Sequence, residues 1–220
     1  MHSRNKGGET SSYMSFPNKP LDAFNAVFDG LKDSGENFIL NKNEMIPLFS
    51  SGNTPHLIFI NIGRFSIYRR YDELLMHSSS SPSFLGVAEY IQARNAHFVL
   101  ADTECSGFKI DAGLAFAILT ESGLWQKVCE ILTYFIQILQ TRDLQLVGVN
   151  AYLTIKNKLL ELLQEPEQLR MTQSVLSYIQ LRSKLSKSLV SKILADLRTG
   201  GYICMKSGKL ISIKHLPRDY

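Results

Sequence analysis

Residues 186–203 read SKSLVSKILADLRTGGYI, and this stretch predicts a helix with two unlike faces. Ser186 is a typical N-cap, and the pair Gly200-Gly201 is typical of the residues that end a helix. At about 100° per residue, one face collects the apolar residues Leu189, Val190, Ile193, Leu194 and Leu197. The opposite face carries Lys187, Ser188, Ser191, Lys192 and Ala195. A narrow face of short and basic side chains suits a helix that enters the major groove of DNA.

The segments around this helix complete a winged helix-turn-helix pattern. A preceding helix is predicted over residues 172–180, followed by a polar turn over 181–185. Residues 202–205 and 210–214 alternate around Gly208, which predicts a two-stranded wing with lysines at its tip. The predicted DNA contacts are Lys187, Ser188, Ser191 and Lys192 on the helix, Arg182 and Lys184 before it, and Lys206 and Lys209 on the wing.

The positive charge of the chain is concentrated in this C-terminal segment. Residues 167–220 contain ten Lys and Arg and three Asp and Glu, a net charge of +7, whereas the other 166 residues carry −3 and the whole chain +4. A basic unit joined to a mildly acidic one is typical of a protein that binds the phosphate backbone of nucleic acid.

The first 120 residues predict a β-rich domain. A short amphipathic helix is expected near residues 21–31, followed by strands at 56–62, 64–70, 97–101 and 105–110. The segments HLIFINI (56–62) and RFSIYRR (64–70) flank Gly63, which predicts a hairpin. With the helices that follow, the fold class is α+β, with a small antiparallel barrel or sandwich.

A long helix is predicted over residues 124–146, with apolar residues on almost every face. A helix that is apolar all round must be buried all round. One face is expected to cover the β domain and the other to meet the same helix of a second copy, the alternative being a core helix of a monomer. The expected dimer contacts are Leu124, Val128, Ile131, Phe135, Ile138 and Leu139.

These patterns divide the chain into four parts. We expect a flexible N-terminus over residues 1–20, a β domain over 21–120, a dimerisation helix over 121–147 and a DNA-binding domain over 148–220. A helix over 151–164 begins the last part and ends near Glu165-Pro166.

The stretch 186–203 resembles the recognition helix and the start of the wing in the catabolite activator and fumarate–nitrate regulator superfamily. Other motifs resemble one enterobacterial branch of it more closely: Tyr178-Ile179, Arg182-Ser183 and the final run GKLISIKHLPRDY (208–220). The likeness extends to FLGVA (84–88), GFKI (107–110) and Leu124-Trp125. It implies an N-terminal cyclic-nucleotide-binding-like β-roll, a long dimerisation helix and a C-terminal winged helix-turn-helix, with Lys187, Ser188, Ser191 and Lys192 facing bases and phosphates.

The resemblance weakens in the sensor region. Nucleotide-binding members of the superfamily carry Gly-Glu-Leu and then Arg-Ser or Arg-Thr, whereas this chain has Gly86-Val-Ala and then Arg94-Asn95. Iron–sulfur members use cysteines near the N-terminus, and this chain has none before Cys105. We therefore expect no cofactor and no metal, and we assign no effector.

The sequence disfavours several other classes of protein. It contains no GxSxG, GxGxxG, Walker or HExxH motif, so we expect no enzyme, and no apolar run long enough to span a bilayer, so we expect no membrane and a cytoplasmic location. The expected partners are double-stranded DNA, a second copy of the chain and RNA polymerase. The alternative is a protein-interaction module that modulates another regulator without binding DNA.

Overall fold

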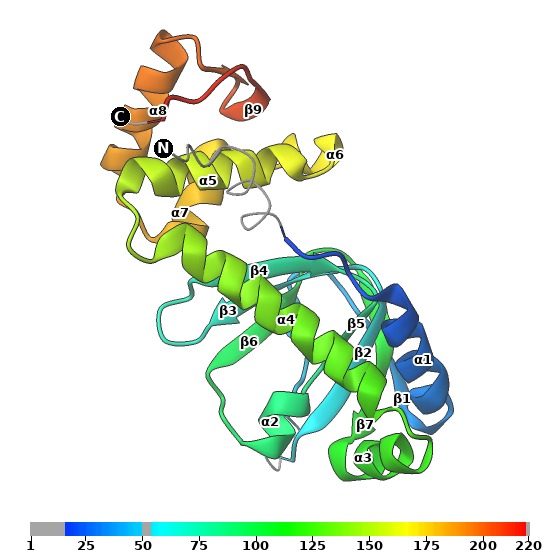
Figure 1. The fold of residues 1–220 in the computed structure, drawn as a ribbon. Helices are drawn as coiled ribbons and strands as arrows, with labels where there is room; N and C mark the ends of the chain where they lie inside the picture. The colour runs from blue at the N-terminus through cyan, green and yellow to red at the C-terminus, as the bar shows by residue number, and fades with distance from the viewer. Residues whose placement is uncertain (1–15, 50–53, 219–220) are drawn as a thin grey trace, which may run out of the picture. The chain divides into compact units, whose positions relative to one another are not determined.

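The computed structural model describes residues 16–49 and 54–218, which form two compact units (Figure 1). Residues 16–139 belong to the first unit, and the second starts at Gln140. Helix α4 (Trp125–Leu146) begins in the first unit and ends in the second. Of the predicted flexible N-terminus 1–20, residues 1–15 lie outside the described residues, whereas Phe16 packs against the core of the first unit.

The first unit is built around a β-roll of two antiparallel sheets, which confirms the predicted α+β class. One sheet has the strand order β1-β7-β2-β5 and the other β4-β3-β6. The strands are β1 (Glu36–Leu40), β2 (His56–Ile62), β3 (Arg64–Arg69), β4 (Leu75–Ser80), β5 (Ser83–Leu85), β6 (His97–Ala101) and β7 (Cys105–Asp111). The helices of this unit are α1 (Leu21–Leu31), the short 3-10 turn η1 (Lys32–Ser34), α2 (Val87–Ile91), α3 (Ala112–Glu121) and most of α4.

Strand β2 is buried on both faces and so separates two apolar cores. Alternate side chains of a strand point to opposite faces. Leu57 and Phe59 therefore join a cluster with residues of α1, α3 and α4, while Ile58 and Ile60 join the cluster between the two sheets. Phe59 stacks on Phe108, its cross-strand neighbour on β7, with ring centroids 5.5 Å apart. Cross-strand aromatic pairs of this kind stabilise a sheet.

The predicted hairpin around Gly63 is wrong. Strand β2 pairs with β5 and β7, whereas β3 pairs with β4 and β6, so the chain changes sheets at Gly63 instead of folding back. Gly63 has φ +108°, and a side chain there would meet the Glu104 carbonyl at 2.4 Å. Glycine permits this corner because it adopts positive φ without a Cβ clash. The strands were recognisable from their composition, but their partners depend on the whole sheet.

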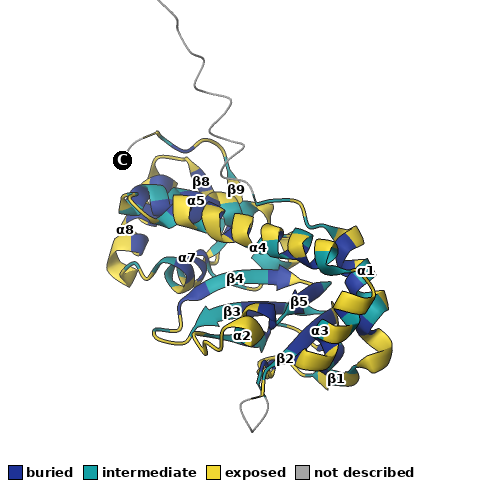
Figure 2. Cartoon of the chain, turned by 60° about the horizontal axis from the view of Figure 1, so that its bottom comes forward, coloured by how far each residue is buried: buried dark blue, intermediate teal, exposed yellow. Residues whose placement is uncertain are grey.

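Helix α4 has an inner and an outer face, and most of the predicted dimer contacts lie on the inner one. Val128, Ile131 and Ile138 are buried in the core of the first unit, and Leu124 and Phe135 pack partly against it. A residue buried inside its own chain is not available to a partner, so the assignments of Val128, Ile131 and Ile138 are corrected, whereas those of the partly buried Leu124 and Phe135 stay predictions. A second apolar row, Cys129, Leu132, Ile136 and Leu139, lies beside these residues and is here called the outer strip. Leu132 is partly buried against the core, whereas the other three are exposed; Figure 2 shows exposed residues along α4.

The second unit is made of four helices after α4 and one hairpin. Its elements are α5 (Ala151–Gln164), α6 (Glu167–Arg170), α7 (Val175–Ser183), α8 (Lys187–Thr199), β8 (Ile203–Lys206) and β9 (Lys209–Ile213). Asn150 caps α5 by accepting a hydrogen bond from the Leu153 backbone N–H at 2.8 Å. No helix in the described part of the chain is long and apolar enough to cross a membrane.

Candidate DNA-binding surface

Helices α7 and α8 form a helix-turn-helix whose turn is set by local backbone chemistry. Helix α7 ends at Lys184, which adopts the left-handed conformation with φ 57°. The next helix begins after Ser186, whose hydroxyl accepts a hydrogen bond from the Leu189 backbone N–H at 3.3 Å. This cap fixes the start of α8, with only three residues (184–186) between the two helices.

Helix α8 separates an apolar face from a polar one. Val190, Ile193, Leu194 and Leu197 are buried in a core shared with Tyr178, Ile179 and residues of α5. The exposed residues include Lys187, Ser188, Ser191, Lys192 and Ala195, as the spacing predicted. Leu189, predicted to be inside, is 37% exposed, so the buried face is narrower than expected.

The N-terminal end of α8 is electrostatically suited to an anion. Its first turn contains no acidic side chain, and it does contain Lys187. The first backbone N–H groups of a helix point outward without intrahelical partners, and the helix dipole adds partial positive charge there. This end of α8 therefore presents donors and positive charge together, which is the arrangement that binds phosphate.

The wing is a tight hairpin whose tip carries the two predicted lysines. Ser207 and Gly208 connect β8 to β9 with φ of 49° and 75°, as in a type I′ turn. Lys206 and Lys209 flank this turn opposite one another, Lys206 exposed and Lys209 partly buried. The Gly208 carbonyl accepts a hydrogen bond from the Val175 backbone N–H at 2.9 Å. This bond fixes the wing tip to the start of α7.

Arg182 lies inside the second unit and not on its surface, which corrects its prediction as a DNA contact. Its residue exposure is 7%. The guanidinium Nε lies 3.5 Å from Glu161 Oε1, and the guanidinium carbon lies 3.7 Å from the Tyr178 ring centroid. Its charge therefore neutralises Glu161 and stacks on an aromatic ring.

Glu161 is the centre of a buried polar cluster that joins α5 to α7 and to the end of α4. Lys158 Nζ lies 2.6 Å from Glu161 Oε2 and donates to Gln145 Oε1 at 2.9 Å, while the Tyr178 hydroxyl donates to Glu161 Oε1 at 2.8 Å. Burial alone would raise the pKa of Glu161, but Lys158, Arg182 and the Tyr178 hydroxyl outweigh it, so this pKa lies below its usual value. Burial and the neighbouring Glu161 carboxylate raise the pKa of Tyr178. The cluster is thus held with Glu161 ionised.

Two further exposed basic residues lie beside the predicted set. Arg198 on α8 and Lys214 just after β9 line a shallow hollow with Cys204 and Met205 of β8. Arg198 follows Ser191 by seven residues, about two helical turns, and therefore lies on the same face. The same spacing rule that selected Ser191 would have found it. Lys214 has no such periodic signal, because its position depends on the wing.

The second unit matches a family model described as winged helix-turn-helix DNA binding over residues 151–218. Curated relatives cover nearly the whole chain. The inhibitor of hydrogen peroxide resistance of Salmonella typhimurium is 33% identical over 204 residues, covering 92% of this chain and 98% of the relative. The protein of the same name in Escherichia coli K12 is 31% identical over 203 residues, with the same coverage of both chains.

Solved structures show the same fold at low sequence identity. The c-di-GMP-responsive global regulator CLP of Xanthomonas campestris aligns with a TM-score of 0.65 at 15% identity, covering 86% of this chain and 99% of its own. A CooA mutant from Carboxydothermus hydrogenoformans aligns with a TM-score of 0.65 at 14% identity, covering 91% and 94%. A putative regulator of the crp/fnr family from Eubacterium rectale aligns with a TM-score of 0.62 at 12% identity, covering 86% and 90%. The predicted order of β-roll, long helix and winged helix-turn-helix is confirmed.

Replacing Glu161 should destabilise the second unit strongly. Glu161→Ala leaves Lys158 and Arg182 without their shared carboxylate, and breaking a buried ion pair from one side costs about 3 kcal/mol or more. The exposed Glu167→Ala on α6 is the matched control and should change the unfolding free energy by less than about 0.5 kcal/mol. Urea denaturation followed by circular dichroism measures both. Equal effects of the two substitutions would show that the cluster does not hold the helices together.

Proposed function

The chain belongs to the family of the inhibitor of hydrogen peroxide resistance, and we propose that it is a sequence-specific, DNA-binding transcription regulator that works as a dimer in the cytoplasm. The observation that carries this proposal is the exposed face of α8. Small and basic side chains occupy it, its N-terminal end is free of acidic groups, and a lysine-tipped wing belongs to the same unit.

The residues of this surface divide into two roles. Ser188 and Ser191 are short, so they allow α8 to approach base edges closely, and their hydroxyls both donate and accept hydrogen bonds. Lys184, Lys187 and Lys192 flank them and are suited to phosphates or to guanine acceptors. Lys206 and Lys209 each contact a phosphate from the tip of the wing. Arg198 extends the cationic surface along α8.

Arg182 serves this proposal as a positioning residue. Its side chain contacts Glu161 on α5 and the Tyr178 ring within α7, and α7 immediately precedes the turn that leads to α8. A rigid scaffold beneath the turn keeps the recognition helix in one orientation, which sequence reading requires. The buried guanidinium of Arg182 therefore orients α7 and the turn that follows it, and it does not contact nucleic acid.

The outer strip of α4 is the surface that we propose for pairing two copies. Cys129, Leu132, Ile136 and Leu139 follow one another at intervals of three and four residues, as in the contact seam of a coiled coil. Ile136 is 54% exposed in the single chain, which is unusual for an isoleucine in the middle of a long helix. Two recognition helices held by such a dimer would reach successive major grooves about 34 Å apart on a pseudo-palindromic site.

The β-roll lacks the residues of a nucleotide sensor under this proposal. Gly86 caps α2 with φ 101°, but the position after it is Val87, which is buried. Arg94, the next basic residue along the chain, is exposed in the segment between α2 and β6. RNA polymerase is the further partner that we propose for the case in which the chain activates transcription beside a promoter.

Removing the wing charges should weaken binding to all DNA sequences alike. Lys206→Ala combined with Lys209→Ala removes two phosphate contacts, so the slope of log affinity against log salt should flatten by about 2. Lys32→Ala combined with Lys42→Ala in the first unit removes equal charge and is the control. Fluorescence anisotropy with labelled duplexes at several salt concentrations measures the slope. An unchanged slope in the wing variant, or salt-independent binding of the parent chain, would favour the protein-interaction alternative.

Changing Ser191 should alter sequence preference and not general affinity. Asn pairs well with the adenine edge in the major groove, so Ser191→Asn should shift the preferred base at one position of each half-site by about 1–3 kcal/mol. Gln168→Asn, exposed on α6, introduces the same residue outside the proposed surface and should leave preference unchanged. Competition among single-base variants of the site measures both. A uniform loss of affinity for Ser191→Asn would place the reading face elsewhere.

A charge in the outer strip should separate the dimer. Ile136→Glu places like charges in an apolar seam, which removes apolar burial and leaves ions without partners. Ile62→Glu, at the end of β2, is the control because Ile62 is 60% exposed and lies outside the strip. Analytical ultracentrifugation should find a dimer for the parent chain and the control, and a monomer for Ile136→Glu. A dimer that survives this substitution would pair through another surface.

A further inference from the structure

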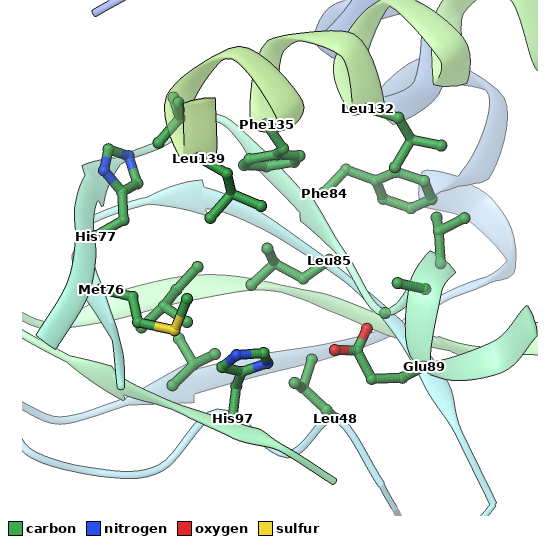
Figure 3. Close-up of a pocket in the computed structure, with 16 residues that line it drawn as sticks. Leu48, Met76, His77, Phe84, Leu85, Glu89, His97, Leu132, Phe135 and Leu139 are labelled. Carbon is green, nitrogen blue, oxygen red and sulfur yellow. The ribbon is translucent and has the colours of Figure 1, made fainter. Parts of the chain in front are cut away.

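The first unit contains a cavity of about 220 Å³ between the β-roll and α4 (Figure 3). Its walls come from strands of both sheets, from the start of α2 and from α4. Met76 and Leu85 contribute from β4 and β5, and Leu132, Phe135 and Leu139 contribute from α4 (Figure 3). The cavity lies entirely within residues 16–139, so it is a property of this unit alone.

The chemistry of the walls is almost wholly apolar. Only three residues that line the cavity carry polar side chains, namely His77, His97 and Glu89, and none is Lys or Arg. Figure 3 shows the Glu89 carboxylate directed into the cavity, on the side where the His97 ring also lies. The cavity therefore offers hydrogen-bond acceptors at one edge and a broad apolar surface elsewhere.

These walls are unsuited to an anion. Moving a phosphate out of water is costly unless cations and hydrogen-bond donors replace its hydration, and Glu89 adds negative charge to the wall. Arg94 is exposed and does not line the cavity. A cyclic nucleotide or another phosphate ester would thus lose its solvation and gain no Lys or Arg, with only the ring N–H groups of His77 and His97 as side-chain donors and the Glu89 carboxylate opposing its charge.

The geometry points to a binding site for an uncharged, mainly apolar small molecule that carries one hydrogen-bond donor, and we propose this ligand class for the cavity. An apolar cavity of about 150 Å³ holds benzene, so one of 220 Å³ suits a molecule of about ten non-hydrogen atoms. The apolar body would pack against Leu85, Phe135 and Leu139, and the donor would meet Glu89 or His97. Leu132 and Leu139 belong to the outer strip as well, so an effect of the ligand on pairing follows if the proposed dimer is correct.

A matched pair of probes tests the ligand class on the full chain without DNA. 1-Naphthol is uncharged at neutral pH and carries one donor, whereas 1-naphthyl phosphate has the same ring and a doubly charged anion. Isothermal titration calorimetry should show saturable binding of one 1-naphthol per chain, and binding of 1-naphthyl phosphate and of cyclic AMP should be weaker by about tenfold or more. Tighter binding of either phosphate would overturn the proposal, and so would absence of 1-naphthol binding.

Variants that fill the cavity locate the bound probe. Leu85→Trp and Leu139→Trp fill it from opposite walls, and each should lower 1-naphthol affinity by about tenfold or more because little space remains. Leu139 is half exposed, so its substitution is the milder one for folding, and circular dichroism confirms that each variant is folded. Ile62→Trp outside the cavity should bind as the parent chain does. Unchanged 1-naphthol affinity in both filling variants would place the probe elsewhere. This test is independent of the DNA-binding proposal, because a chain that did not bind DNA could still bind 1-naphthol in the cavity.

Discussion

The packing of one stripe of α4 against the β-roll is the interaction on which the rest of the first unit depends. Val128 and Ile131 complete the apolar core around Phe59 and Phe108, and Ile138 joins the same core while also lining the cavity. Because the apolar face of α4 is wider than the stripe that the core covers, part of it stays exposed beside the polar face of Gln126, Thr133 and Gln137. The outer strip therefore lies next to the buried stripe, and its members Leu132 and Leu139 also line the cavity.

The helix-turn-helix and the wing could be predicted from sequence because their signals are local. The Ser186 cap, the spacing of Val190, Ile193 and Leu197, and the positive φ available at Gly208 each act within a few residues. Helical periodicity alone predicts the exposed face of α8. The exception is Leu189 at the edge of this face, which the periodicity places inside and the structure shows exposed. The same periodicity also predicts Arg198 on this face, although it is not among the predicted DNA contacts.

What the sequence did not reveal depends on contacts between distant segments. Arg182 was predicted as a surface cation because basic charge is usually solvated, but Glu161 lies 21 residues earlier and becomes its neighbour only after folding. The stripe of α4 chosen for dimerisation was strongly apolar, which is the property that also buries it in its own chain. The cavity has no sequence signature, because its walls are drawn from β4, β5, α2 and α4 together.

The central claim is that α8 reads DNA as one of a symmetric pair, and selection of bound fragments from random duplex DNA tests it most directly. The purified full chain is compared with the double variant Lys187→Ala/Lys192→Ala at two salt concentrations. The account predicts enrichment of a two-fold symmetric site with half-sites about 34 Å apart, weakened by salt and lost in the variant. Absence of an enriched site, or the same site enriched equally by the variant, would contradict it.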